Sequence, residues 1–353
     1  MFSPKEYLYN LVTYKVKGPL AAFLRGILFL SSLAYGLIVT VISFFYRLRP
    51  VRFNCRIISV GNITLGGTGK TSLVGYLAAK LSQQGNKVAV LSRGYKRDKK
   101  LSGLDGIGDE PAMLQKKLPQ VPVIVERDRL KASIRAIQDY AADTLILDDG
   151  MQQWRIHKDL EITTIDAGNP FGNLRLLPAG FLREPLAALS RSDIFVLTQA
   201  DAHQDTAGLK QKLKRFNPCA LIVESRHKPV GFSNLSNPGE ALGVDIFKGK
   251  TVVAFSGIGN QQAFENTLCS LGVTIARSLR FADHQDYTQA DLDGVIRYAR
   301  ERSLGIIITT EKDAVKVARL EIHGVRIFSL NIKLSITSNE AEFDRRLFKL
   351  RSL

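Results

Sequence analysis

Short apolar runs alternate with longer segments of helical periodicity through most of the chain after residue 50. The runs have the length and composition of buried strands, and each is followed by a segment of mixed polarity. Strands are expected at residues 56–60, 87–94, 121–126, 143–150, 161–165, 193–197 and 220–223. Continuous apolar strands separated by helices are typical of a parallel sheet that is covered on both faces. The pattern therefore predicts an α/β domain.

A turn-rich stretch at residues 227–243 interrupts this alternation. Its proline, glycine, serine and asparagine residues are typical of a linker. Beyond it the alternation restarts, with strands expected near 251–257, 305–310 and 325–330 and a helix from about residue 261. We therefore expect a second, smaller α/β domain after the linker.

An apolar stretch without charge covers residues 26–46, before the first expected strand. A helix of this length extends about 31 Å at 1.5 Å per residue, close to the thickness of a bilayer core. Arg25 precedes the stretch and four arginines follow it between residues 47 and 56, which favours a cytosolic body. The run is too long for a cleaved signal peptide. Membrane attachment is expected, with a full span and an interfacial position both open, and a buried soluble helix is the alternative.

A glycine-rich loop connects the first expected strand to a helix at residues 70–81. The loop has most of the phosphate-binding pattern G-x-x-x-x-G-K-[ST], and only its first glycine is replaced, by Thr64. In such loops backbone amides face the phosphates, the lysine reaches the β- and γ-phosphates, and the hydroxyl binds Mg²⁺. The residues expected to bind nucleotide are Gly66, Gly67, Thr68, Gly69, Lys70 and Thr71.

Two adjacent carboxylates, Asp148 and Asp149, end the apolar run of residues 143–150. A phosphate-binding loop needs a carboxylate to fix its metal ion, and adjacent carboxylates repel each other unless a cation or a proton lies between them. The pair is therefore expected to bind Mg²⁺, with either residue as the direct ligand. A turn or helix cap is the structural alternative.

The composition and the net charge limit which binding partners and metal sites are expected. The formal charge of +16 indicates an anionic partner, such as nucleic acid, an acidic membrane or a phosphorylated substrate. No cluster of aromatic and basic residues suitable for stacking single-stranded nucleic acid is present. The three cysteines are far apart, and the histidines lack metal-ligand spacing, so neither a disulfide framework nor a zinc site is expected. The stretch TQAD at residues 198–201 matches the guanine-binding motif [NT]-K-x-D only weakly, because Gln199 replaces its lysine, so a GTPase is not favoured.

Two further motifs are ambiguous on their own. Asp109 and Glu110 directly precede Pro111, which is the usual composition of a helix start. His284 lies among polar residues in an expected loop, where a single histidine is usually only solvated.

Together these stretches resemble the tetraacyldisaccharide 4′-kinases, which phosphorylate a lipid A precursor. The resemblance extends from about residue 57 to 316 and includes the altered phosphate-binding loop and the N-terminal apolar helix. The matching stretches, in the order of the family, are VGNITLGGTGKT, LSRGYKR, GDEP, LILDDGMQ, LLPAGFLREP, FSGIGN, FADHQDY and TTEKDAVK. Met151 and Gln153 depart from the family, which more often has Phe and His there.

The resemblance implies a role for each matching residue. Asp109 would accept the proton of the sugar 4′-hydroxyl, and His284 would pair with it. Lys70, Thr71 and the two aspartates would hold ATP and Mg²⁺. The residues implied to line the cleft near the substrate headgroup are Tyr95, Glu110, Arg183 and Glu184.

The sequence is thus interpreted as an α/β lipid sugar kinase with four parts. These are an N-terminal membrane-anchoring helical segment at residues 1–50, a P-loop NTPase-type parallel-sheet kinase domain at 51–226, a linker at 227–250, and a smaller α/β domain at 251–353. The resemblance implies an acylated disaccharide phosphate as partner, with the enzyme at the cytoplasmic face of the inner membrane and no nucleic-acid partner. One alternative is a membrane-associated P-loop regulatory ATPase or GTPase, which would not need the Asp109–His284 pair. Another is a basic membrane-bound nucleic-acid-binding protein, which would need strong salt-dependent binding of DNA or RNA.

Overall fold

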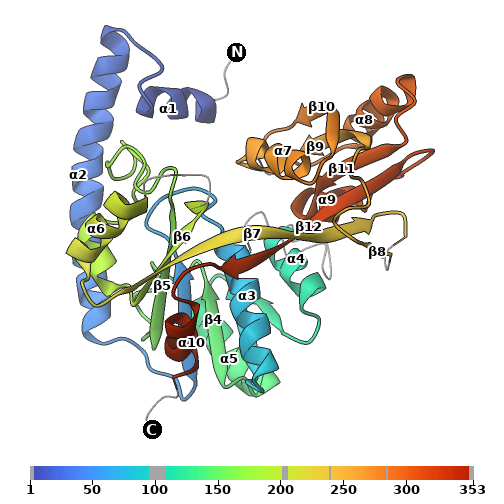
Figure 1. The fold of residues 1–353 in the computed structure, drawn as a ribbon. Coiled ribbons are helices and arrows are strands. Elements are labelled where there is room, and N and C mark those ends of the chain that lie inside the picture. Colours follow the sequence, from blue (N-terminus) through green and yellow to red (C-terminus); the bar gives the residue numbers. More distant parts are fainter. Residues whose placement is uncertain (1–3, 95–108, 201–205, 238–239, 284, 350–353) are drawn as a thin grey trace. The chain divides into compact units, whose positions relative to one another are not determined.

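The computed structural model describes residues 4–94, 109–200, 206–237, 240–283 and 285–349 (Figure 1). The chain divides into two compact units, each assembled from separate segments. The first unit contains Met1–Arg93, Glu126–Arg226 and Ile336–Leu353, and the second contains Gly94–Val125 and His227–Ser335.

The first unit is built on a parallel sheet. Its strands are β1 (Arg56–Gly61), β2 (Val88–Ser92), β4 (Thr144–Asp148), β5 (Leu160–Asp166), β6 (Ile194–Thr198) and the first part of β7 (Leu221–Asn234). The strands lie in the order β7-β6-β5-β1-β4-β2, and every neighbouring pair is parallel. All five residues of β2, β4 and β6 are buried, as expected for strands covered on both faces. The predicted parallel sheet is confirmed.

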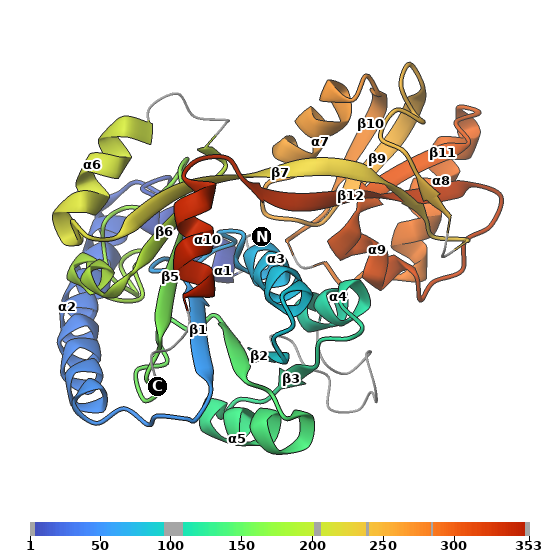
Figure 2. The ribbon, with the colours of Figure 1, turned by 60° about the horizontal axis from the view of Figure 1, so that its bottom comes forward.

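Helices surround this sheet. They are α1 (Pro4–Val12), α2 (Pro19–Leu48), α3 (Lys70–Gln83), α5 (Arg129–Tyr140), the 3₁₀ helix η2 (Leu186–Arg191), α6 (Thr206–Phe216) and α10 (Glu340–Phe348). The C-terminal helix α10 lies beside α3 (Figure 2). Phe343 packs against Tyr76 with ring centroids 6.4 Å apart, and Lys80 Nζ lies 2.6 Å from Asp344 Oδ1. These contacts attach the end of the chain to the first unit.

The second unit is a smaller α/β structure. Its elements are α4 (Asp109–Lys117), β3 (Val123–Val125), β8 (Ala241–Leu242), β9 (Thr251–Ser256), α7 (Gln261–Ser270), β10 (Thr274–Arg280), α8 (Gln289–Glu301), β11 (Ile306–Thr310), α9 (Glu311–Val317) and β12 (Arg326–Ile336). Strand order is β10-β9-β11-β12-β7, with β10, β9, β11 and β12 parallel. Lys117 of α4 binds Glu311 of α9 at 2.8 Å, which places α4 in this unit.

The units divide the chain differently from the boundaries expected from the sequence. Residues 227–234, expected to start the linker, continue β7 as a strand. Tertiary pairing explains this difference, because the Leu235 amide donates to Ile327 and Phe232 is fully buried. The Thr337 amide donates to Glu224, so β12 leads the chain back to the first unit. Long-range hydrogen bonds of this kind are not visible in local composition.

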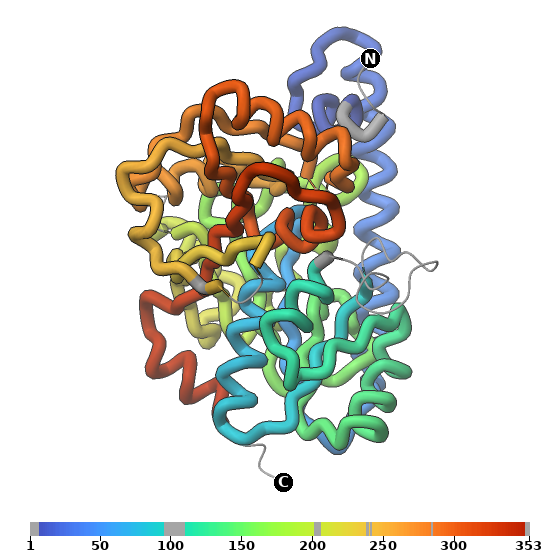
Figure 3. The backbone as a smooth tube through the Cα atoms, turned by 90° about the vertical axis from the view of Figure 1, so that its right-hand side faces the viewer, coloured from blue at the N-terminus to red at the C-terminus, as the bar shows by residue number. Residues whose placement is uncertain are grey.

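Helix α2 covers the predicted apolar stretch and runs beside the first unit (Figure 3). Among the described residues it is the one helix long and apolar enough to cross a membrane, with a mean hydropathy of 2.2 in its most apolar part. A stripe of mostly small residues faces the protein: Ala21, Ser32, Gly36, Val39 and Ser43. Large apolar residues on other sides are exposed, including Leu20, Phe23, Leu30, Leu33, Leu37, Phe44, Phe45 and Leu48.

Candidate active site

The glycine-rich loop lies between the end of β1 and the start of α3. Gly66 has φ 123° and Gly69, the residue that caps α3, has φ 77°, conformations that favour glycine. A Cβ atom at Gly66 or Gly67 would meet no other atom within 4 Å. These glycines therefore leave open space beside the backbone, as a ligand that approaches the amides requires. The N-terminus of the 14-residue helix α3 adds its partial positive charge.

Buried threonines fix the two sides of this loop. Thr68 is 4% exposed, and its hydroxyl lies 2.7 Å from that of Thr164 on β5. Thr64, which replaces the usual first glycine, forms an antiparallel bridge with Leu182 and is also buried. Position 64 therefore packs against the LLPAGFLREP segment.

Lys70 is the first residue of α3, and its ammonium group lies near two polar side chains. Its Nζ donates to Asn62 Oδ1 at 2.9 Å and lies 3.7 Å from Asp149 Oδ1. Asn62 is fully buried and donates through Nδ2 to the Thr64 carbonyl at 2.7 Å. Asn62 therefore links the loop backbone to the lysine. Asn62 was not among the residues predicted from the sequence, although it belongs to the VGN that opens the matched motif.

The two predicted acidic residues follow one another at the end of β4, but their surroundings differ. Asp148 is 5% exposed and accepts from Ser92 Oγ at 3.4 Å. Asp149 has φ 57° and makes a bidentate pair with Arg183, at 2.6 Å for Nη1–Oδ1 and 2.9 Å for Nη2–Oδ2. Burial alone raises the pKa of Asp149, but the Arg183 hydrogen bonds and the Lys70 charge outweigh it and lower that pKa. Asp149 is therefore held ionised.

The predicted ligand residues have the chemistry that a magnesium ion requires. Carboxylate and hydroxyl oxygens are the ligands that Mg²⁺ prefers, and Asp148, Asp149 and the Thr71 hydroxyl supply them. Thr71 is the second residue of α3. Among the described residues, no group of three or more His, Cys, Asp or Glu side chains could hold a metal. A metal ion here would need further oxygen ligands, from water or from phosphate.

The predicted pair Arg183 and Glu184 divides between two environments. Arg183 lies beside the glycine loop, where it pairs with Asp149 and also donates to Asn62 at 3.3 Å. Glu184 is 1% exposed and accepts hydrogen bonds from Gln152, Trp154 and Arg191. Its carboxylate is thus committed to neighbouring protein groups. The role that the resemblance implies for Glu184, beside the substrate headgroup, stays a prediction. Its observed hydrogen bonds hold in place the segment that carries Arg183.

Three matched motifs meet in the second unit, at the ends of β9 and β11. Asp313 is fully buried and accepts from the Gly257 amide at 3.0 Å and from the Thr310 hydroxyl at 2.7 Å. Lys316 donates to the Gln285 carbonyl at 2.8 Å, and Lys312 lies 3.5 Å from Asp283. FSGIGN, TTEKDAVK and the described part of FADHQDY therefore form one cluster. His284 itself lies outside the described residues.

Other predicted residues are described only in part. Asp109 is the first residue of α4, as the helix-start interpretation expected, but its side chain lies outside the described part of the chain. Glu110 is the second residue of this helix and is half-buried. Tyr95 is not among the described residues. The structure therefore brings Lys70, Asp149 and Arg183 together and leaves the Asp109–His284 pair as a prediction.

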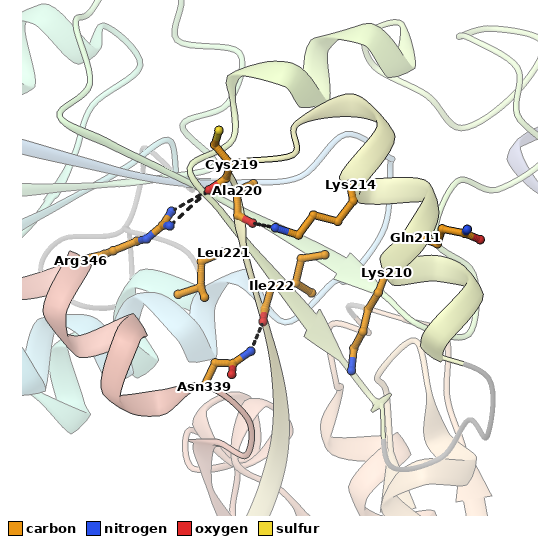
Figure 4. A pocket seen from close by; sticks show the side chains of 9 residues that line it. All are labelled: Lys210, Gln211, Lys214, Cys219, Ala220, Leu221, Ile222, Asn339 and Arg346. Atoms are coloured by element: carbon orange, nitrogen blue, oxygen red, sulfur yellow. Dashed lines mark hydrogen bonds between the residues drawn. The ribbon is translucent and has the colours of Figure 1, made fainter.

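A hollow of about 360 Å³ in the first unit is lined by none of the candidate active-site residues. Figure 4 shows basic side chains around it, from α6 and α10. Lys214 donates to the Pro218 and Ala220 carbonyls, and Arg346 donates to the Cys219 carbonyl. Lys210 is paired with Glu224 at 2.7 Å. These cations stabilise the packing of α10 and the start of β7, which gives the hollow a structural explanation.

A parallel sheet with a lysine-bearing glycine loop after β1 and an acidic pair at the end of β4 defines a P-loop nucleotide-binding protein. The family profile described as tetraacyldisaccharide-1-P 4′-kinase, LpxK, matches residues 24–351. The chain belongs to this family. The resemblance found in the sequence is confirmed, and with it the assignment as a kinase.

Individual members of the family are similar to this chain along nearly its whole length. The tetraacyldisaccharide 4′-kinase of Halothermothrix orenii is 36% identical, over 94% of this chain and 94% of its own. The tetraacyldisaccharide 4′-kinase of Syntrophus aciditrophicus is 36% identical, over 86% of this chain and 90% of its own. The solved structure of LpxK from Aquifex aeolicus in complex with ATP is 30% identical, covers 92% of this chain and 99% of its own, and has a TM-score of 0.71.

Proposed function

We propose that this protein transfers the γ-phosphate of ATP to the 4′-hydroxyl of a tetraacyl disaccharide 1-phosphate, a step of lipid A synthesis. The observation that carries the proposal is the convergence of Lys70, Arg183 and Asp149 at the glycine loop. Two cations and an ionised carboxylate there match the needs of phosphoryl transfer, in which positioning and charge neutralisation provide most of the rate. Membership of the kinase family supports the same reaction.

The residues of the first unit would hold the donor. Backbone amides of the glycine loop would bind phosphate oxygens, and Lys70 would neutralise the charge on the β- and γ-phosphates. Mg²⁺, bound with the nucleotide, would neutralise charge on the transferred group. Thr71, Asp148 and Asp149 would hold that ion. Arg183 would orient Asp149 through its bidentate contact.

The acceptor side rests on Asp109 and His284. Asp109 would take the proton of the sugar 4′-hydroxyl as it attacks, with His284 as its partner. The Lys316–Gln285 contact supports this assignment by fixing the residue that follows position 284. Tyr95, Glu110 and Glu184 remain proposed neighbours of the substrate headgroup.

The exposed apolar face of α2 supports attachment to a membrane, and we place the protein at the cytoplasmic face of the inner membrane. An interfacial helix fits the contacts of α2 with its own unit better than a full span. Arg175 lies over the Phe29 ring and Arg155 over the Tyr46 ring, so protein covers one side along about 26 Å of helix. The opposite side would enter the lipid. An acylated substrate could then stay in the bilayer, avoiding about 0.8 kcal/mol per extracted methylene.

The test uses the full chain in detergent with γ-labelled ATP, Mg²⁺ and a 1-phosphorylated tetraacyl disaccharide. Label should appear on the lipid, and Lys70→Ala should abolish the transfer, whereas the exposed Lys131→Ala should not change it. Asp109→Asn should lose far more turnover than ATP affinity, because a base acts in the transition state. Release of free phosphate at a rate indifferent to lipid would instead favour a regulatory ATPase or GTPase.

A further inference from the structure

The turn that carries the acidic pair is held against β1. The Gly150 amide donates to the Val60 carbonyl at 2.9 Å. Met151 is fully buried, and a Cβ atom on Gly61 would lie only 2.4 Å from Met151 Cβ. The turn therefore has little room to shift on this side. Its two ends, the carbonyls of Asp148 and Met151, are each bound by a buried cation.

Arg129 binds the first end of the turn. It is the first residue of α5 and is 2% exposed. Its Nη2 donates to the Asp148 carbonyl at 3.1 Å, and its Nη1 donates to the Glu126 carbonyl. Arg129 takes part in none of the ion pairs between described residues. Its Nε is buried and has no hydrogen-bond partner among those residues. The guanidinium is thus directed at backbone oxygens.

Lys158 binds the other end. Its side chain is 8% exposed, and Nζ donates to the Met151 carbonyl at 3.0 Å. Both carboxylate oxygens of Glu161 accept from the same ammonium group at 2.9 Å. Glu161 also accepts from Ser59 on β1 at 3.1 Å. Burial lowers the pKa of Lys158, and Glu161 opposes this by favouring the charged form.

Removing these cations from water is costly, and apolar side chains of the same size would fill the space at lower cost. The common feature of the two side chains is a hydrogen bond to a carbonyl that flanks Asp149. We propose that Arg129 and Lys158 are positioning residues that fix the Asp148–Met151 turn so that both aspartates face a bound metal–nucleotide complex. This inference rests on the proposed function, in which the aspartates hold Mg²⁺.

The direction of the carboxylates matters because Mg²⁺ demands near-ideal octahedral geometry. Adjacent carboxylates repel each other, so a turn released at either end would let them separate. The glycine loop, which binds phosphate directly, makes none of the contacts described for Arg129 and Lys158. Loss of either cation should therefore weaken nucleotide binding only when Mg²⁺ is present.

The first test replaces Arg129. ATP affinity of the full chain in detergent is measured by calorimetry with Mg²⁺ and with EDTA, and thermal stability is measured alongside. Arg129→Met should weaken Mg²⁺-dependent affinity about 10–100-fold, the usual effect of losing a group that orients a metal ligand. Affinity in EDTA should stay unchanged, and Arg129→Lys should recover part of the loss. Arg135→Met, an exposed arginine of the same helix, is the matched control.

The second test replaces Lys158 together with its partner. Lys158→Met alone leaves Glu161 buried without its cation, so the chain could lose stability for that reason. The double variant Lys158→Met, Glu161→Leu removes both charges and should restore the melting temperature. It should still bind ATP more weakly with Mg²⁺ and normally in EDTA, because the Met151 carbonyl has lost its donor.

Two results would overturn the inference while the proposed function stands. One is wild-type Mg²⁺–ATP affinity in both Arg129→Met and the double variant. The other is an equal loss with and without Mg²⁺, which would assign these residues to the stability of the unit. Failure of the proposed function is recognised separately, because the unaltered protein would then transfer no label to the lipid.

Discussion

Arg183 and Asp149 form a two-point ion pair beside the phosphate loop, with distances of 2.6 and 2.9 Å. The two residues are 34 positions apart and come from loops of the same unit. A bidentate contact fixes both the position and the plane of the carboxylate, which a single lysine contact would not. The contact therefore places Arg183, the arginine of the LREP stretch, beside Asp149 and the glycine loop.

Replacing Arg183 should reduce turnover strongly. Arg183→Met should lower kcat about 10²–10³-fold, the range for losing a preorganised charged donor near a transition state. Arg183→Lys should have an intermediate kcat, because lysine keeps the positive charge but cannot donate two parallel hydrogen bonds to the carboxylate. Steady-state kinetics on the lipid substrate would measure both. Arg215→Met, an exposed arginine on α6, should behave as the unaltered protein, and wild-type turnover in Arg183→Met would contradict this role.

Gly67 offers a separate test of the loop. Gly67→Ala should leave the melting temperature nearly unchanged, because the new Cβ meets no protein atom within 4 Å. ATP affinity should fall at least about tenfold, equivalent to ~1.4 kcal/mol, because the methyl group would occupy space beside the phosphate-binding amides.

Gly294→Ala is the matched control for this variant. Position 294 lies within α8 and is equally open, so alanine should stabilise the protein by about 0.5–1 kcal/mol and leave ATP binding unchanged. Normal ATP affinity in Gly67→Ala would show that the loop does not approach phosphate at this residue.

The sequence predicted those parts of the fold that depend on local pattern. The strand, glycine loop and helix around Lys70 were predictable because apolar runs, glycines and a helical pattern all agree there. The start of β7 was predicted, but its continuation past residue 223 was not. Pro229 and Gly231 are residues that strands disfavour, and pairing with β8 and β12 outweighs that preference.

The candidate site was predictable by residue type more than by arrangement. Lys70 and the aspartates could be named as candidates because a P-loop lysine and an acidic pair at the end of a strand are recognisable by residue type and position. The burial of Glu184 was not foreseeable, since carboxylates are usually exposed and its main partner Arg191 is seven residues away. Arg129 gave no signal, because its contact with Asp148 depends on how α5 packs on the sheet.

Tyr35 connects helix α2 to the loop that carries Arg183. Its hydroxyl donates to the Arg183 carbonyl at 2.9 Å. Tyr35→Phe should destabilise the first unit by about 0.5–1.5 kcal/mol, the usual value of one hydrogen bond, and should lower turnover because Arg183 is less firmly held. Thermal unfolding and kinetics would measure these effects. Tyr7→Phe, at an exposed position of α1, is the control, and equal behaviour of the two variants would mean that this contact carries no energy.

The pH dependence of stability in the second unit should depend on Glu265. Hydrogen bonds from Arg280 hold the pKa of this carboxyl below its ordinary value of 4.5, against the opposing effect of burial, and the Ser278 hydroxyl adds to them. A carboxyl with a lowered pKa in the folded state stabilises the protein while it is ionised. This contribution is complete above the ordinary value and is lost as the pH falls from there through the folded value.

The variant Glu265→Gln removes the charge at every pH and isolates this effect. Its melting temperature should be lower than that of the unaltered protein by a constant amount between about pH 6 and 8, where Glu265 is ionised in both states. Below about pH 4.5 the two curves should converge, because protonation of Glu265 leaves the native side chain with no charge to lose. Glu321→Gln, an exposed acid of the same unit, should show no such convergence. A difference between Glu265→Gln and the native protein that persists unchanged into acid would mean that shape at position 265, and not its charge, stabilises the contact with Arg280.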